Sequence, residues 1–375
     1  MATDPVGAVL SKFQPILNLS EENVDQIGIS VPLPHFTESL MTELADLVLN
    51  VFKQKKTLVE IEAPIYIVGD IHGNIFDLMR ILIYAKTPPA SRLLFLGDYV
   101  DRGEYSIEVL AILFALQCAY PDHILLLRGN HEFAQVNQSY GFYEEVTAEF
   151  GRNNFWKHVN EVFQYMPLAA VVSKSVFCVH GGLSPTLTNP YIIEQIVRPI
   201  EDYDSADLIG DILWSDPANS DKEYVRSTRG SGVAFNSGAV MRFLRESKLS
   251  CVVRAHQCVP LGIMKFANGG LFTVFSSSNY EDNGTNRCGL LYVTKDKTTQ
   301  VFSLPPLTIH RRKDVLFDHH AKKASKPTLT LNIKLAEILH SQKSSKSMTS
   351  RPIRNSAVMH VEKVNRSTSN LPPLK

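Results

Sequence analysis

The sequence predicts an α/β fold, in which a central two-sheet β-sandwich is flanked by helices on both sides and followed by a basic C-terminal tail. Apolar runs at 65–68, 93–96 and 124–127 each end in a glycine-containing polar loop, and they recur about thirty residues apart, as repeated strand–helix units do. Further strand-like runs follow up to residue 304, and aromatic residues then become sparse.

Residues 1–57 are predicted to be a helical N-terminal segment of the catalytic domain, because apolar residues recur at helical spacing from Leu40 to Val51. Residues 58–307 are predicted to be the catalytic core. Their near-continuous apolar strands indicate a sheet that is covered on both faces. In such sheets ligands bind beyond the carboxyl ends of the strands, where the three polar loops fall.

The second half of the core is predicted to add the facing sheet. Runs at 169–172 and 175–179 read as a hairpin around Ser173 and Lys174. Further strand-like runs occupy 251–254, 270–275, 290–293 and 300–304.

Residues 308–375 are predicted to be a basic, mostly disordered regulatory tail, with one amphipathic helix at 331–342. Residues 305–375 hold 14 Lys/Arg and 4 Asp/Glu, whereas residues 1–304 hold 24 Lys/Arg and 34 Asp/Glu. The body is therefore acidic and the tail basic, so each favours partners of opposite charge.

The five cysteines are odd in number and show no metal-binding spacing, which favours a reducing compartment, the cytoplasm and/or the nucleus. The sequence shows no signal peptide and no apolar stretch near the ~18 residues that a membrane span needs. No membrane association is expected.

Three loops carry candidate metal ligands: 69–73 (Gly-Asp-Ile-His-Gly), 97–103 (Gly-Asp-Tyr-Val-Asp-Arg-Gly) and 128–132 (Arg-Gly-Asn-His-Glu). Asp98 carries two carboxylate oxygens and can bridge two ions. The other candidates offer oxygen or imidazole nitrogen: Asp70, His72, Asn130, His180 and His256. Such a mixed O/N set suits two divalent ions of Mn, Fe or Zn. Two such ions activate a shared water for attack on a phosphate ester.

The same loops supply groups for the leaving oxygen and for the phosphate. His131 is a candidate general acid, and Asp101 is placed to orient its imidazole. The arginines Arg102, Arg128 and Arg229 are candidate phosphate ligands, because a guanidinium fork matches phosphate oxygens.

These motifs resemble those of the serine/threonine protein phosphatase superfamily, the phosphoprotein phosphatases of the metallophosphoesterase fold, and the similarity extends from about residue 35 to residue 305. Within it the chain looks most similar to type-1-like catalytic subunits. Further matches lie at 140–143, 180–185, 213–217, 254–257 and 278–280.

The resemblance implies a calcineurin-like metallophosphoesterase that hydrolyses phosphoserine and phosphothreonine in proteins by direct attack of a dinuclear-metal-bound hydroxide. It implies one metal at Asp70, His72 and Asp98, and the other at Asp98, Asn130, His180 and His256. It further implies phosphate binding by Arg102, Asn130 and Arg229, an acid pair of His131 with Asp101, and Tyr280 in the cleft wall.

Two departures from the family bear on selectivity. The family often has Cys-Gly where this chain has Glu281 and Asp282, in a loop expected to overhang the cleft. Residues 298–300 (Thr-Thr-Gln) are more polar than the groove in which type-1 enzymes hold regulatory subunits, although Phe302 retains part of it. We therefore expect regulatory subunits to meet an altered groove.

Residues 313–317 (Lys-Asp-Val-Leu-Phe) match the basic-x-Val-x-Phe peptide that such grooves bind, although the pattern is loose enough to arise by chance. The hypothesis is that the tail docks on its own chain or on another copy.

Phosphoprotein substrates are expected, and specific nucleic-acid binding is not. Two alternatives stay open: another metal-dependent phosphoesterase acting on small molecules or nucleic acids, and a non-catalytic scaffold.

Overall fold

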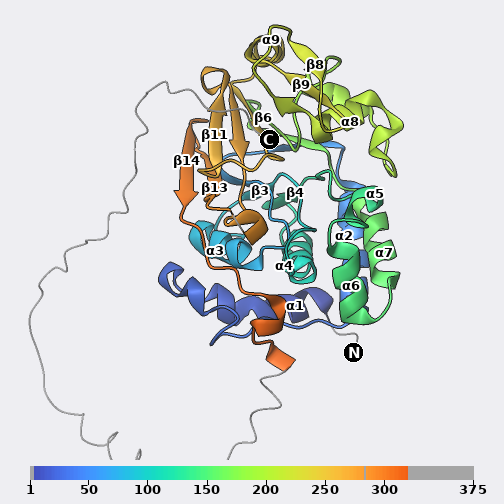
Figure 1. Ribbon diagram of the computed structural model, residues 1–375, viewed down its shortest axis with the longest axis vertical. Helices are drawn as coiled ribbons and strands as arrows, with labels where there is room; N and C mark the ends of the chain where they lie inside the picture. The colour runs from blue at the N-terminus through green and yellow to red at the C-terminus, as the bar shows by residue number, and fades with distance from the viewer. Residues whose placement is uncertain (1–3, 283, 320–375) are drawn as a thin grey trace, which may run out of the picture. The chain divides into compact units, whose positions relative to one another are not determined.

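Two facing β-sheets form the centre of the fold (Figure 1). The computed structural model describes residues 4–282 and 284–319. The first sheet has the strand order β14-β13-β2-β3-β4. Its strands are β2 (Ile65–Val68), β3 (Leu93–Phe95), β4 (Ile124–Leu126), β13 (Cys288–Val293) and β14 (Thr299–Leu304). The first three are mutually parallel, which confirms the predicted strand–helix repeat.

The second sheet has the order β1-β5-β6-β10-β12-β11. Its strands are β1 (Leu58–Ile61), β5 (Ala169–Val172), β6 (Val176–Val179), β10 (Cys251–Arg254), β11 (Ile263–Phe266) and β12 (Leu271–Val274). The predicted hairpin joins β5 to β6. Ser173 and Lys174 have φ of 46° and 54°, and the Ser175 N–H donates to the Val172 carbonyl at 2.9 Å, which closes a tight turn between the strands.

Successive side chains of a strand point to opposite faces of its sheet. The parallel strands β2, β3 and β4 of the first sheet are therefore apolar at every position, because both faces of that sheet are covered. Leu94 belongs to the core between the sheets, as does Val253 of the second sheet, whereas Leu93 and Phe95 belong to the core under the helices on the other face. Both faces of the first sheet are thus buried. The two sheets share a core made by alternate residues of each.

Helices cover both outer faces of the sandwich, as predicted. The first sheet packs against α1 (Pro5–Leu17), α2 (Glu38–Gln54), α3 (Ile75–Ala85), α4 (Ser106–Ala119), α6 (Phe142–Phe150) and α7 (Asn154–Phe163). The second sheet packs against α8 (Asp207–Trp214) and α9 (Ser237–Ser247). The helical spacing from Leu40 to Val51 belongs to α2, which confirms helix in the N-terminal segment.

The sequence did not reveal a small third sheet of β7 (Asp216–Pro217), β8 (Tyr224–Arg226) and β9 (Val233–Phe235), whose strands are too short to show periodicity. The remaining short helices are η1 (Glu21–Gln26), α5 (Ala134–Asn137), η2 (Pro190–Gln195), η3 (Tyr203–Ser205), η4 (Ala267–Gly269), η5 (Tyr280–Asp282) and η6 (Arg312–Asp314).

The packed chain extends past residue 307, where the core was predicted to end. We call residues 305–319 the C-terminal strap. Its Leu316 N–H donates to the Gly28 carbonyl at 2.7 Å, and its carbonyl accepts from Leu33 N–H at 2.9 Å. Val315 and Phe317 are 8% and 5% exposed and join the helical core. Residues 313–317 thus dock on their own chain, beside Leu33.

Arg312 anchors the strap electrostatically. Its guanidinium donates to the Glu108 carboxylate at 2.8 and 2.9 Å and to Glu149 at 2.8 Å. Glu108 is 1% exposed, so its charge depends on this partner. Burial raises the pKa of Glu108, and Arg312 opposes that rise.

The predicted helix at 331–342 and the rest of the tail lie outside the described residues. Among the helices of 4–282 and 284–319, none combines the length and apolar character that crossing a bilayer would need.

The strap is predicted to contribute to global stability. Phe317→Ala should lower the free energy of unfolding by about 3 kcal/mol, because it leaves a cavity in the helical core. Urea denaturation of the full chain measures this. Lys313→Ala, at an exposed neighbouring position, serves as the control and should change stability by less than about 0.5 kcal/mol. Equal stability of the two variants would contradict a role for the strap in the core.

Candidate active site

The candidate residues converge because they follow the carboxyl ends of parallel strands in both sheets. Strand β2 leads to Asp70 and His72, β3 to Asp98, and β4 to Asn130. From the second sheet, β6 leads to His180 and β10 to His256. The sheets meet here: the His256 N–H donates to the Asp70 carboxylate at 2.8 Å. The six predicted metal ligands are all brought together.

Three of these ligands and two residues that follow Asp98 occupy the left-handed region of φ, which non-glycine residues enter at a cost of roughly 1 kcal/mol or more each. Their φ values are 48° for His72, 57° for Asp98, 72° for Asp101, 70° for Arg102 and 68° for His256. The loops turn sharply enough to aim these side chains inward.

Glu132 holds two of the loops together. Its carboxylate accepts N–H groups of Asp98 and Tyr99 at 2.8 Å and of Gly129 at 3.0 Å. The loops approach so closely that a Cβ on Gly129 would lie 2.2 Å from Asp98 Oδ1. This contact explains why glycine and glutamate flank Asn130 and His131 in the motif.

One candidate cluster lies around His72. Its Nε2 is 3.6 Å from Asp70 Oδ2 and 3.6 Å from Asp98 Oδ2. The His72 Nδ1 is 3.0 Å from the Val100 carbonyl and must donate to it, because a carbonyl only accepts. Burial, and then the nearby His131, lower the pKa of His72 to about 3. A neutral ring with Nε2 free of hydrogen is the form that binds a metal.

A second cluster shares Asp98. His180 Nε2 lies 3.3 Å from Asp98 Oδ2 and 2.8 Å from Asn130 Oδ1. Its Nδ1 is 3.0 Å from the Leu96 carbonyl, so this ring too is oriented through Nδ1. The donor atoms of Asp98, His180 and His256 all lie within 4.8 Å of one another.

The buried polar atoms fit a pair of cations. Within the described residues, His256 Nε2 is buried without a hydrogen-bond partner. Asp70 and Asp98 are each 1% exposed, and burial together with the Asp98 charge raises the pKa of Asp70 to about 6. Divalent ions would satisfy the ring nitrogen and neutralise the paired carboxylates.

His131 and Asp101 form a buried pair beside these clusters. The two groups are joined by a 2.6 Å hydrogen bond from His131 Nδ1 to Asp101 Oδ2, and the other Asp101 oxygen accepts from Phe142 N–H at 2.9 Å. Burial opposes the imidazolium, but the charges of Asp98 and Asp101 raise the pKa of His131.

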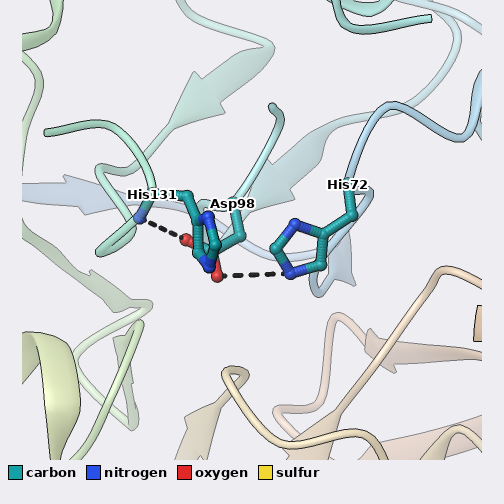
Figure 2. A group of neighbouring side chains, drawn as sticks. All are labelled: His72, Asp98 and His131. Carbon is teal, nitrogen blue, oxygen red and sulfur yellow. Dashed lines mark hydrogen bonds and ion pairs between the residues drawn. The ribbon is translucent and has the colours of Figure 1, made fainter. Parts of the chain in front are cut away.

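Figure 2 shows the Asp98 carboxylate between the His131 backbone nitrogen and the His72 ring. The His131 backbone N–H donates to Asp98 Oδ1 at 3.0 Å, while Asp98 Oδ2 faces His72. The donor atoms of His72, Asp98 and His131 also lie within 4.8 Å of one another.

The predicted phosphate ligands border the clusters, and each arginine has a carboxylate partner. Arg102 Nη1 is 3.0 Å from Glu281 Oε1. Arg229 Nε is 2.5 Å from Asp216 Oδ2. The Tyr280 ring centroid lies 5.3 Å from that of His72, so Tyr280 is also at the site.

Arg128 was wrongly predicted as a phosphate ligand. It is 1% exposed, and its guanidinium donates to the carbonyls of Glu132 at 3.0 Å and Ile200 at 2.7 Å. Two of its guanidinium nitrogens are thus bound to backbone carbonyls, and its burial keeps the side chain away from a substrate phosphate.

Sequence reasoning gave no role to Arg254 and Asp216. The fully buried Arg254 donates to the Ser215 carbonyl at 3.0 Å and to Asp216 at 2.8 Å. Asp216 in turn binds Arg229. An arginine inside an apolar strand two residues before His256 was a usable signal for such a buried charge.

Comparisons with known proteins agree with this geometry. Residues 63–260, more than half of the chain, match the calcineurin-like phosphoesterase family, and the chain belongs to that family. The family depends on a dinuclear metal centre, for which the two clusters sharing Asp98 are the candidate ligands.

The matching relatives within that class are protein phosphatases. The chain is 38% identical over 252 residues to a protein phosphatase 2A catalytic subunit of Dictyostelium discoideum, covering 67% of this chain and 79% of that protein. A solved protein serine/threonine phosphatase from Saccharomyces cerevisiae, described as similar to human phosphatase PP5, superposes with a TM-score of 0.69 at 27% identity. That match covers 74% of this chain and 92% of the yeast chain. The finer similarity to type-1 enzymes stays a prediction.

Metal binding is predicted to require Asp98 and to weaken in acid. The pKa of Asp70 is about 6 in the metal-free protein. Below that pH a bound ion must displace a proton from Asp70, and His180, whose pKa the Asp98 charge raises, must also give up a proton, so Mn²⁺ affinity should fall by at least roughly tenfold per unit of pH. Titration calorimetry of metal-free protein between pH 5 and pH 7.5 measures this.

Asp98→Asn should lose most Mn²⁺ binding, whereas Asp46→Asn, at an exposed position of α2 that pairs with His158, should bind as the unmodified protein does. Unchanged affinity for Asp98→Asn would contradict the shared ligand.

Proposed function

We propose that the chain removes phosphoryl groups from serine and threonine side chains of proteins at the buried clusters around Asp98. Family membership and the two matched phosphatases make it a metal-dependent protein serine/threonine phosphatase. The observation that carries the proposed mechanism is the sharing of Asp98 by two ligand clusters beside the His131–Asp101 pair.

The proposed ligands are Asp70, His72 and Asp98 for one ion, and Asp98, Asn130, His180 and His256 for the other. Mn, Fe or Zn suits this oxygen and nitrogen set. When bound, two such ions lower the pKa of a shared water and neutralise phosphoryl oxygens.

The side chains then divide the remaining tasks. Arg102, Asn130 and Arg229 hold the phosphoryl oxygens, and Tyr280 borders them. His131 Nδ1–H donates to Asp101, which leaves Nε2 to carry the proton that the leaving serine or threonine oxygen requires. The carboxylate favours the imidazolium, so His131 keeps this proton at neutral pH more readily than a free histidine.

Three alternatives are weighed against this proposal. His131 falls within one cluster, so it competes with Asp70 as a metal ligand. Its bond to Asp101 favours the acid role. A small-molecule or nucleic-acid phosphoesterase would need the same metals, and a scaffold would not need the buried ligands.

Regulatory partners are also proposed, since the similar Dictyostelium protein is a catalytic subunit. β14 lies at the edge of its sheet, with Val301 41% exposed and Phe302 half-buried. An extended peptide can add to such an edge. The free cysteines support a reducing compartment such as the cytoplasm or nucleus.

The substrate class is tested with phosphoserine peptide, phosphotyrosine peptide, a nucleotide and DNA, each with added Mn²⁺. We expect hydrolysis of the phosphoserine peptide above the others. No hydrolysis of that peptide by the unmodified protein would overturn the proposed function.

The acid role is tested by leaving-group dependence. His131→Ala should lower kcat for phosphoserine peptide by about 10²–10⁴-fold. It should affect p-nitrophenyl phosphate much less, because that leaving group needs no proton. Equal losses on both substrates, with reduced bound metal, would instead make His131 a ligand.

Asp101→Asn should shift the alkaline loss of peptide kcat/KM to lower pH. The Asp101 charge raises the pKa of His131, so removing it lets His131 lose its proton earlier as the pH rises. Rate profiles from pH 5.5 to pH 9, with bound metal measured in parallel, provide the test. An unmoved alkaline limb would contradict the pairing.

A further inference from the structure

Glu281 stands on a sharply turned loop beside the candidate active site. Its φ is 57°, in the left-handed region, and Asn279 has φ of 50°. The buried Asn286 side chain fixes the turn by accepting from Tyr280 N–H at 2.9 Å and donating to the Ser277 carbonyl at 2.8 Å. The strained turn therefore presents Glu281 outward beside Tyr280.

The carboxylate of Glu281 pairs with a predicted phosphate ligand. Glu281 Oε1 lies 3.0 Å from Arg102 Nη1, with side chains 56% and 35% exposed respectively. Arg102 is also held by contacts that do not involve Glu281. Its guanidinium lies 4.5 Å from the Tyr140 ring centroid, and its backbone N–H donates to the Tyr140 carbonyl at 2.9 Å. Arg102 can thus keep its place when the exposed Glu281 moves.

Arg229, the other arginine predicted to bind phosphate, pairs with a carboxylate that is held more firmly than Glu281. Asp216, which pairs with Arg229, is only 15% exposed and also binds the fully buried Arg254 at 2.8 Å. Releasing Asp216 would leave a buried charge without its partner, which is costly. Moving Glu281 away from Arg102 has no such cost, because its carboxylate is largely in solvent. Of these two carboxylates, Glu281 is the displaceable one.

We propose that Glu281 is a specificity-determining residue that selects phosphoserine and phosphothreonine sites flanked by basic side chains. The substrate phosphoryl group displaces Glu281 from Arg102, and the released carboxylate binds a lysine or arginine next to the phosphorylated residue. This inference rests on the proposed function, whose substrate class it narrows.

The charges explain the direction of the preference. A phosphoryl group carries about two negative charges and outcompetes one carboxylate for a guanidinium. The displaced Glu281 then lies near that dianion and repels it, unless a cation from the substrate intervenes. The acidic body, with 34 Asp/Glu against 24 Lys/Arg in residues 1–304, acts in the same direction.

Binding is measured with peptides carrying a non-hydrolysable phosphonate analogue of phosphoserine, flanked by arginine or by alanine, on the Mn²⁺-loaded full chain. Fluorescence anisotropy should show about three- to fivefold tighter binding of the arginine peptide, as expected for an exposed ion pair. The preference should shrink in high salt.

Two variants test the residue itself. Glu281→Gln should reduce the preference to near unity and bind the alanine peptide more tightly than the unmodified protein, because Arg102 is no longer occupied. Glu281→Lys should remove the preference and favour a glutamate-flanked peptide. The matched control is Glu246→Gln on α9, an exposed site on the helix that covers the second sheet, which should keep the full preference.

The outcomes separate this inference from the proposed function. A preference of the same size in Glu281→Gln, or no preference in the unmodified protein, overturns the role of Glu281. If the charge preference is present and lost in Glu281→Gln while phosphoserine peptides are not hydrolysed, the recognition role stands and the phosphatase assignment fails. If the unmodified protein binds neither phosphonate peptide, the role of Glu281 is overturned as well.

Discussion

The placement of one carboxylate, that of Asp98, is the constraint on which the site depends. Its Oδ2 lies 3.6 Å from His72 Nε2 and 3.3 Å from His180 Nε2, so it connects ligands from both sheets. Its Oδ1 accepts from the His131 N–H, and Glu132 accepts its own N–H. A residue with φ of 57° keeps this position only because these bonds over-determine it.

The sandwich makes that placement possible. Leu94 and Val253 belong to the apolar core between the two sheets, and the loops beyond that core meet where the His256 N–H donates to the Asp70 carboxylate. Polar loops then need only a residue or two to reach the shared site. The same arrangement disfavours charge on two of the metal-ligand histidines, because burial lowers the pKa of both His72 and His256, whereas the Asp98 charge outweighs burial and raises the pKa of His180. The neutral rings of His72 and His256 and the paired carboxylates of Asp70 and Asp98 together favour cations at the site.

Selectivity depends on different physics from the buried centre. Arg102 and Glu281 lie where solvent reaches, with side chains 35% and 56% exposed, and their pairing is worth little in stability. Such pairs exchange partners readily, which is what recognition of a charged substrate needs. The ion pair that anchors the C-terminal strap is instead buried. Its Glu108 carboxylate binds Arg312 through two hydrogen bonds, which fixes the position of the strap on the helices.

The sequence by itself determined the strand–helix repeat, the β5–β6 hairpin and the set of residues that meet at the site, because periodicity and motif position follow from local spacing. It also anticipated the His131–Asp101 contact. Only the tertiary structure decided that Arg128 is enclosed by backbone carbonyls, that residues 313–317 dock beside Leu33, and that Glu281 reaches Arg102. Each of these facts depends on contacts between segments far apart in the chain, and such contacts leave no periodic trace in either segment.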